Sequence, residues 1–280
     1  MKQPLISVQD VHFTYPDGTK ALFGASLDIY EGEMMAIVGQ NGSGKTTLVK
    51  HFNGLLKPTV GDVLVEGISV KKQPLGQLAQ KVGYVYQNPS LQLFCRSVRD
   101  EVSFGLKLAK VPPDVIKKRV EEVLDTVGLL DKIEEYPFFL TTGEKQRVAI
   151  AAVLSLNPSV LIVDEPTTGQ DFKRAYQFME IFERLNKEEN KTIIFITHEM
   201  RFTTEFAQRT VVVNDGKVLL DGLSTQVFTQ VEKLQEAFVT PPQITQLALQ
   251  LGSLGIRPDI LKVNELYAEI KKEYQDLKVG

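Results

Sequence analysis

The chain has 280 residues, of which 43% are hydrophobic and 24% charged, as in an ordinary globular protein with room for a full core. Its net charge of −3 gives no electrostatic reason to expect nucleic acid or an anionic membrane as the main partner. The single cysteine, Cys95, excludes an internal disulfide. No apolar run approaches the roughly 20 residues of a membrane span and no signal peptide is visible, so we expect any membrane role to depend on a partner protein.

The first elements have the pattern of strands. Residues 5–13 alternate partly between apolar and polar side chains, and a turn at 15–18 follows. Residues 22–29 then predict a second strand, closed by the polar residues at 31–33. We expect a small antiparallel β-layer here.

A glycine-rich segment follows a short apolar strand at 34–38 and precedes a helix at 47–52. It matches G-x-x-x-x-G-K-[ST] and consists of Gly39, Gln40, Asn41, Gly42, Ser43, Gly44, Lys45 and Thr46. Strand, glycine loop and helix form the context in which this pattern cradles phosphates on backbone N–H groups. Lys45 would reach the β- and γ-phosphates and the Thr46 hydroxyl would ligate Mg²⁺. A chance glycine turn is the alternative, but the flanking strand and helix favour a nucleoside triphosphate site.

The next stretch adds a hairpin and a block of helices. Residues 61–70 predict a hairpin, and residues 81–86 a strand that ends at 87–89. Residues 96–130 have helical spacing, interrupted by the prolines at 112 and 113. This block separates two halves of an α/β core, as an inserted helical subdomain would.

Residues 140–146 lead into an apolar helix at 147–156, and a buried strand at 160–163 ends at Asp164 and Glu165. Ligands bind beyond the carboxyl ends of strands in open α/β sheets. Asp164 would hold Mg²⁺ through water, and Glu165 would polarise the attacking water. The alternative is an acidic pair that stabilises a helix N-terminus.

An amphipathic helix at 174–187 precedes a third buried strand at 192–197, and His198 stands at its end. Of the three histidines, His198 is the one placed to touch a γ-phosphate. His12, in a strand, and His51, on a helix, we expect to be structural or solvated.

The last third predicts a closing hairpin at 210–214 and 217–220 and helices near 225–238, 243–251 and 259–277. The final helix can pack on its own core, the commoner outcome, or on a second subunit. Its apolar side consists of Val263, Leu266, Tyr267, Ile270, Tyr274 and Leu277.

These elements predict an α/β fold: a P-loop NTPase core, with a mostly parallel sheet flanked by helices. An antiparallel β subdomain, a helical subdomain at about 90–157 and a C-terminal helical extension complete it. We expect a nucleotide-binding domain over 1–240 and the extension over 241–280.

In this order and spacing, the motifs over residues 5–240 resemble those of an ATP-binding cassette (ABC) ATPase. The resemblance implies ATP and Mg²⁺ as ligands. The implied nucleotide contacts are Tyr15 (stacked on adenine), the loop residues Gly39 to Thr46, Thr47, Gln87, the signature residues Thr141, Thr142, Gly143 and Glu144, and Asp171. The implied metal ligands are Thr46, Gln87 and Asp164, and the implied catalytic residues are Glu165, His198 and Lys45. From spacing alone, Tyr15 could equally be a half-buried strand tyrosine.

Such cassettes work as head-to-tail pairs, with each ATP between the phosphate loop of one subunit and the signature of the other. The resemblance therefore implies a second ATPase subunit, the same chain or a different one. It also implies a transmembrane coupling subunit, a substrate-binding membrane protein and a place on the cytoplasmic face of the cell membrane. Nucleic acid is not an expected partner.

A narrower likeness lies just after Gln87, in residues 87–94 and 98–105, and again at 240–244. These segments look like the ATPase components of energy-coupling factor transporters, which import vitamins and metal ions such as cobalt. There Asp100 and Glu101 would pair with arginines of a membrane subunit. The alternative is a solvated helix start.

Two residues depart from the family pattern: Thr142 stands where the signature has glycine, and Gln170 where an apolar residue is common. A β-branched residue at 142 could obstruct a close backbone approach or disfavour a positive φ. We therefore expect a weakened signature and a different cassette as partner.

The alternatives are the ATPase of another ABC transporter type, a soluble ABC ATPase acting on ribosomes or DNA, and a nucleotide sensor without turnover. A single cassette and an acidic balance disfavour the ribosome or DNA machine. A nucleotide sensor without turnover is disfavoured because the residues expected to bind and hydrolyse ATP are all present: Lys45, Asp164, Glu165 and His198.

Overall fold

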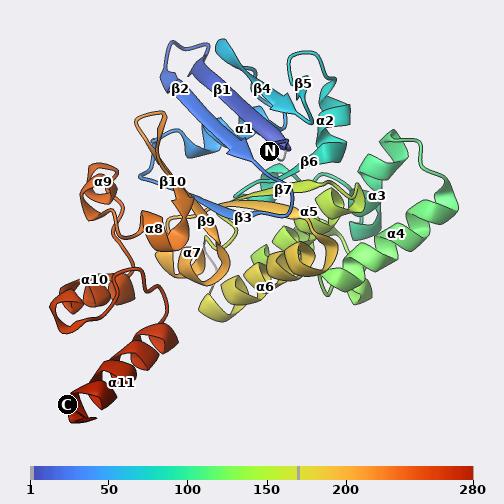
Figure 1. Ribbon diagram of the computed structural model, residues 1–280. Coiled ribbons are helices and arrows are strands. Elements are labelled where there is room, and N and C mark those ends of the chain that lie inside the picture. Colours follow the sequence, from blue (N-terminus) through green and yellow to red (C-terminus); the bar gives the residue numbers. More distant parts are fainter. Residues whose placement is uncertain (1–2, 169–170, 280) are drawn as a thin grey trace.

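The computed structural model describes residues 3–168 and 171–279 and contains two β-sheets (Figure 1). The smaller sheet is antiparallel where its strands pair, with the strand order β2-β1-β4-β5. Its strands are β1 (Ile6–Thr14), β2 (Lys20–Ile29), β4 (Val60–Val65) and β5 (Ile68–Ser69). The predicted antiparallel β-layer is thus confirmed.

The larger sheet has the order β10-β9-β3-β8-β7-β6, and every neighbouring pair is parallel except β10 with β9. Its strands are β3 (Met34–Val38), β6 (Val82–Val85), β7 (Val160–Asp164), β8 (Thr192–Ile196), β9 (Arg209–Asn214) and β10 (Lys217–Leu223). All residues of β3, β6, β7 and β8 are buried, because a parallel sheet is covered on both faces.

The alternation of side chains along β3 divides the core into two layers. Met35 and Ile37 pack with the smaller sheet and with α1 (Lys45–Phe52), while Met34, Ala36 and Val38 face the helices on the opposite side. The central sheet therefore lies between the antiparallel layer and a helical layer, as Figure 1 shows.

The remaining helices are short to medium in length. They are α2 (Leu75–Lys81), α3 (Val98–Leu108), α4 (Pro113–Thr126), α5 (Thr142–Ser155), α6 (Phe172–Glu189), α7 (Met200–Phe206), α8 (Ser224–Val227), α9 (Val231–Glu236), α10 (Gln243–Gln250) and α11 (Val263–Val279). Single 3₁₀ turns occur at Pro89–Leu91, Leu130–Lys132, Pro137–Phe139 and Gly252–Leu254.

Three predicted helix boundaries are wrong. Helix α5 begins at Thr142 rather than at 147, because Thr141 and Glu144 form a capping box. The helix expected over 225–238 is two helices, α8 and α9, and α11 begins at Val263 rather than at 259.

The C-terminal helices α10 and α11 lie to one side of the body (Figure 1) around a small apolar cluster that includes Ala248, Ile260 and Leu266. An ion pair between Lys262 and Glu205 of α7, 3.3 Å long, links them to the body. Of the predicted apolar side of α11, Leu266 is buried, and Val263, Tyr267 and Ile270 are exposed. The side chains of Tyr274 and Leu277 lie outside the described residues.

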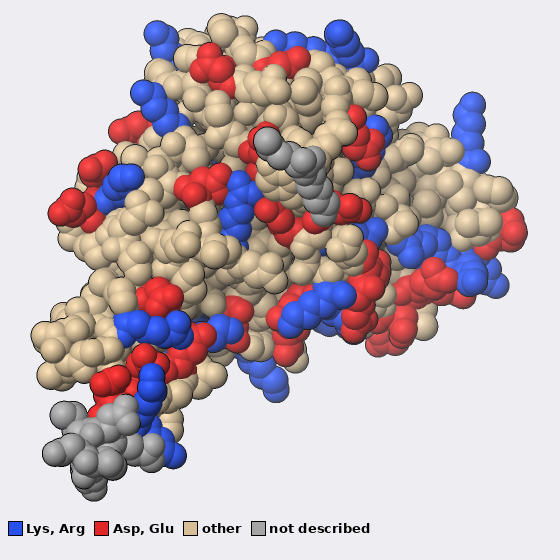
Figure 2. Space-filling view, in the orientation of Figure 1, with Lys and Arg blue, Asp and Glu red and all other residues tan. Residues whose placement is uncertain are grey.

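Charged side chains of both signs are interspersed on the face seen in Figure 2, without a broad patch of one sign. Among the described helices, none combines the length and apolarity needed to cross a membrane.

Candidate active site

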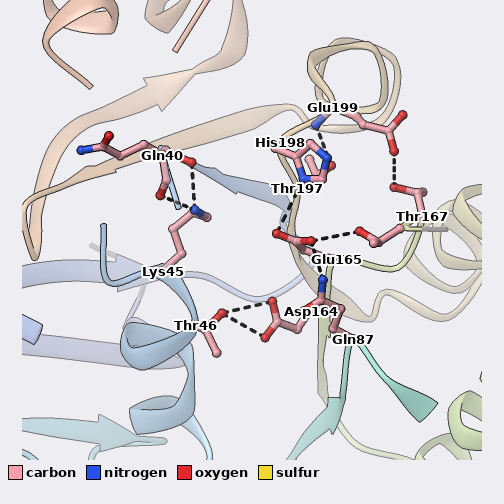
Figure 3. A network of polar contacts seen from close by, with 12 residues as sticks. Gln40, Lys45, Thr46, Gln87, Asp164, Glu165, Thr167, Thr197, His198 and Glu199 are labelled. Atoms are coloured by element: carbon pink, nitrogen blue, oxygen red, sulfur yellow. Dashed lines mark hydrogen bonds and ion pairs between the residues drawn. The ribbon is translucent and has the colours of Figure 1, made fainter. Parts of the chain in front are cut away.

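Four predicted motifs leave the carboxyl ends of four neighbouring strands. The phosphate loop follows β3, His198 follows β8, the Asp164-Glu165 pair closes β7, and Gln87 follows β6. Because these strands lie in the order β3-β8-β7-β6, segments far apart in sequence meet at one edge of the sheet (Figure 3).

The phosphate loop has a backbone that only glycine fits at its first position. Gly39 has φ +148°, and a Cβ there would lie 2.1 Å from the carbonyl oxygen of Val213. The Lys45 Nζ donates to the carbonyl oxygens of Gly39 and Gln40, both at 2.8 Å, and so holds the loop closed. Burial lowers the pKa of Lys45, and the carboxylates of Glu165 and Asp164 act in the opposite direction. A cation enclosed in this way suits an anionic ligand.

Three further loop residues differ in their exposure to solvent. The Ser43 hydroxyl is buried and, within the described part of the chain, has no hydrogen-bond partner. Asn41 and Gly42 are exposed at the tip of the loop. The phosphate loop therefore combines a buried hydroxyl, that of Ser43, with an exposed tip at Asn41 and Gly42.

Asp164 and Thr46, two of the predicted metal ligands, are hydrogen-bonded directly to each other. The Thr46 Oγ1 donates to Asp164 Oδ2 at 3.1 Å and to Oδ1 at 3.3 Å, and the Tyr84 hydroxyl donates to Oδ2 at 2.7 Å. Burial raises the pKa of Asp164, whereas the hydrogen bonds from Tyr84 and Thr46 lower it. A desolvated carboxylate beside a hydroxyl fits Mg²⁺, which prefers oxygen ligands and usually takes only one or two carboxylates. Among the described residues there is no group of three or more His, Cys, Asp or Glu side chains that could hold a metal ion.

Glu165 lies at the centre of the polar network in Figure 3. Its Oε2 accepts hydrogen bonds from Gln87 Nε2 at 2.8 Å and Thr168 Oγ1 at 2.9 Å, and its Oε1 lies 3.6 Å from Nδ1 of His198. Its φ of +47° is unusual for a residue with a side chain. Strained backbones of this kind concentrate at functional sites.

Tyr15 is half-buried, and its hydroxyl forms a hydrogen bond of 2.9 Å with Thr47 Oγ1. Its ring also packs edge-on against Phe13. The structure thus places Tyr15 beside the phosphate loop helix, as the adenine-stacking prediction requires, but half-buried in its strand region, as the alternative proposed.

The signature residues do not meet the phosphate loop. Thr141, Gly143 and Glu144 line a cleft with α4 and α6, whereas Gly39, Gln40, Glu165 and His198 line a separate pocket. Asp171 caps α6 by accepting from the Arg174 amide. Gln170 lies outside the described residues. Within this chain the signature and the phosphate loop are therefore separate sites.

The signature itself is ordered by local contacts. The Glu144 carboxylate accepts from the Thr141 amide at 2.8 Å and pairs with Lys132. Lys132 and the Thr141 amide lower the pKa of Glu144 to about 2. Thr142 lies in the first turn of α5 and is not among the residues with positive φ. Thr142 therefore does not adopt a positive φ in this conformation, and obstruction of a close backbone approach by its side chain stays a prediction.

Some residues of the site were not predicted. Tyr84 lies in an apolar strand, where its hydroxyl gave no periodic signal, and Thr168 is the second of two adjacent threonines after β7. Of the predicted acidic pair, Asp100 is exposed and bonded to Lys107, whereas Glu101 is buried with Oε2 accepting the amides of Phe94 and Cys95. Only Asp100 is open to a partner in this conformation.

Fold and site define a P-loop nucleotide-binding protein with a paired-carboxylate site. The ABC transporter family model matches residues 22–168, and the chain belongs to that family. The chain is 40% identical over 269 residues to the energy-coupling factor transporter ATP-binding protein EcfA1 of Caldanaerobacter subterraneus, covering 94% of this chain and 97% of that protein.

The chain is also similar to solved structures, including the following two. One is cbiO1 from Clostridium perfringens, described as part of the ABC transporter complex cbiONQ, with 36% identity, a TM-score of 0.76, and coverage of 91% of this chain and 98% of that one. The other is a dimer of the ATP-binding cassette MJ0796 in a post-hydrolysis state bound to ADP and Pi, with 29% identity, a TM-score of 0.71, and coverage of 78% and 98%. The chain spans only 43 to 45% of the length of three longer ABC transporter relatives.

Proposed function

We propose that this chain binds and hydrolyses ATP to power a membrane importer, of the energy-coupling factor type, for a vitamin or metal ion. The observation that carries the proposal is the meeting of Gln87, Glu165 and His198 within hydrogen-bond or ion-pair distance beside the Thr46–Asp164 pair. The likeness to EcfA1 and to cbiO1 supports the importer type.

In this mechanism the chain's own groups hold the phosphates and position a water. Lys45 leaves the carbonyl oxygens of Gly39 and Gln40 for the β- and γ-phosphates. Glu165 leaves Gln87 and Thr168 to polarise the attacking water, and His198 contacts the γ-phosphate. Thr46, Asp164 and Gln87 would hold Mg²⁺, which neutralises charge that develops on the phosphates.

The separation of signature and phosphate loop supports a second cassette as partner, since neither site is complete alone. The MJ0796 dimer is a precedent for such pairing. A transmembrane coupling subunit and a substrate-binding membrane protein would hold the pair at the cytoplasmic face of the cell membrane. We assign residues 1–240 to the ATPase domain, including a helical subdomain at about 90–157, and 241–280 to the extension.

The test is to measure ATP binding and Mg²⁺-dependent phosphate release by the chain with its partners and in two variants. Lys45→Ala should lose nucleotide binding, because it removes the cation that holds the phosphates. Glu165→Gln should keep binding and lose at least about 100-fold in turnover, the scale of a general base. Equal turnover in Glu165→Gln and wild type would refute the proposed role of Glu165.

The signature of this chain is proposed to be weakened by Thr142, with a different cassette as partner. Thr142 does not need a positive φ, but its side chain is exposed at the helix start, where it would stand in the way of a close backbone approach to the partner's nucleotide. Thr142→Gly should therefore raise turnover in the assembled complex. Unchanged turnover would count against a weakened signature.

A further inference from the structure

The side chain of Gln146 joins helix α5 to the loop that carries Glu165. Gln146 is only 3% exposed and lies in the second turn of α5. Its Nε2 donates to the carbonyl oxygen of Pro166 at 2.7 Å, a buried hydrogen bond directly after Glu165 in sequence. Removing this donor would break a buried hydrogen bond, and such a bond contributes about 0.5–1.5 kcal/mol.

The loop needs such support because of its backbone. Glu165 has φ +47°, a conformation that costs of the order of 1–3 kcal/mol and persists only where its surroundings enforce it. From the sheet side, the Glu165 amide donates to the carbonyl oxygen of Ile196 at 3.0 Å. From the helix side, Gln146 donates a hydrogen bond to the carbonyl oxygen of Pro166, the residue after Glu165. The two hydrogen bonds fix the loop from opposite sides.

Helix α5 also begins at the signature, with Thr141 as its N-cap. Gln146 follows five residues later, about 7.5 Å along the same helix at 1.5 Å per residue. A helix moves as a rigid element over this length. Any shift of the signature end is therefore transmitted to the carbonyl of Pro166.

We propose that Gln146 is a positioning residue for Glu165, which makes the geometry of this chain's hydrolytic carboxylate depend on the position of its own signature helix. This inference rests on the proposed function, in which the signature engages a nucleotide bound by the partner cassette. Occupancy of one nucleotide site then affects hydrolysis at the other through a direct contact.

The test uses Gln146→Met, which keeps the side-chain length and removes the amide donor. Gln73→Met is the matched control: Gln73 is 9% exposed and also donates to a backbone carbonyl, that of Ile68 at 2.9 Å, but lies between β5 and α2, away from Glu165. Three quantities are compared with wild type in the full chain with its partners: the affinity for ATP, kcat, and the deuterium uptake of the peptide 163–168.

Gln146→Met should lower kcat about tenfold, change ATP affinity less than about twofold, and increase deuterium uptake at 163–168. Gln73→Met should change none of these three. Unchanged kcat and uptake in Gln146→Met would overturn the inference, as would parallel losses of affinity and kcat that track a lower melting temperature. If the wild-type protein does not hydrolyse ATP, the proposed function is refuted. The deuterium uptake of peptide 163–168 in wild type and Gln146→Met would still decide whether Gln146 holds the loop.

Discussion

Asp164 has an orientation set by a neighbouring strand. The Tyr84 hydroxyl donates to Asp164 Oδ2 at 2.7 Å from β6, while Thr46 donates from the phosphate loop helix. Groups that hydrogen-bond a metal ligand typically change metal affinity 10- to 100-fold when removed. We predict that Tyr84→Phe raises the Mg²⁺ concentration for half-maximal ATPase activity about tenfold, and weakens Mg²⁺-dependent ATP binding measured by calorimetry.

Tyr86→Phe is the control for this prediction, because Tyr86 packs edge-on against Tyr84 in the same segment. It should leave the Mg²⁺ requirement unchanged. An unchanged requirement in Tyr84→Phe as well would show that the hydroxyl does not position Asp164.

His51 makes the stability of the fold depend on pH. The ring is fully buried in α1, its Nδ1 donates to the Thr47 carbonyl at 2.7 Å, and it packs edge-on against Phe13. Burial lowers the pKa of His51 below its ordinary 6.5, against a smaller opposite effect of the Thr47 carbonyl. Between the lowered pKa and 6.5 the unfolded chain binds more protons than the folded one, so stability falls as pH falls through this window.

We therefore predict that the wild type loses more unfolding free energy between about pH 7.5 and about pH 5.5 than His51→Asn does. Asn keeps a donor near the Thr47 carbonyl and does not titrate. Urea denaturation at each pH measures the difference, and parallel pH profiles of the two proteins would contradict it.

The residue scale is also where sequence reasoning fell short. The sequence predicts four of the site residues because they lie in a spaced motif or at the end of an apolar strand: Lys45, Thr46, Asp164 and Glu165. Tyr84 and Gln146 were not predicted, since Tyr84 is a single polar group in an apolar strand and Gln146 is one of several polar residues in the first turns of α5. Their role depends on which carboxylate or carbonyl the tertiary fold brings opposite them.

At the scale of elements, helix α5 shows how a local motif sets a boundary. The capping box of Thr141 and Glu144 satisfies backbone donors at the helix start. We predict that Thr141→Ala destabilises the protein by about 1 kcal/mol, whereas Thr141→Ser, which keeps the hydroxyl, has little effect. Urea unfolding measures both, and equal losses in the two variants would exclude capping as the cause.

Strands were predicted more accurately than helix ends. The buried run at 34–38 coincides with β3, and the run at 160–163 lies within β7, because a continuous apolar run bounded by turns leaves little choice. The start of α5 was missed although Thr141-x-x-Glu144 is a capping sequence, since the apolar pattern that signalled the helix starts only further along. The order of the strands in the central sheet was not predicted, because local sequence patterns do not specify which strands pair.

At the scale of the molecule, one feature governs function: the signature and the phosphate loop occupy different clefts of the same chain. The exposed residues Val263, Tyr267 and Ile270 on α11 show that the extension does not bury all of its apolar side on this chain. Neither observation names the partner, but both are consistent with a cassette that works in an assembly.

The most direct test of that central claim is the ATPase rate per chain, measured as the purified protein is diluted, with Glu165→Gln as the background. We predict that the rate per chain falls toward zero on dilution and is restored by adding a second cassette, this chain or a different one. A constant rate per chain over a wide dilution range, abolished in Glu165→Gln, would show that one chain forms a complete active site and would contradict the proposal.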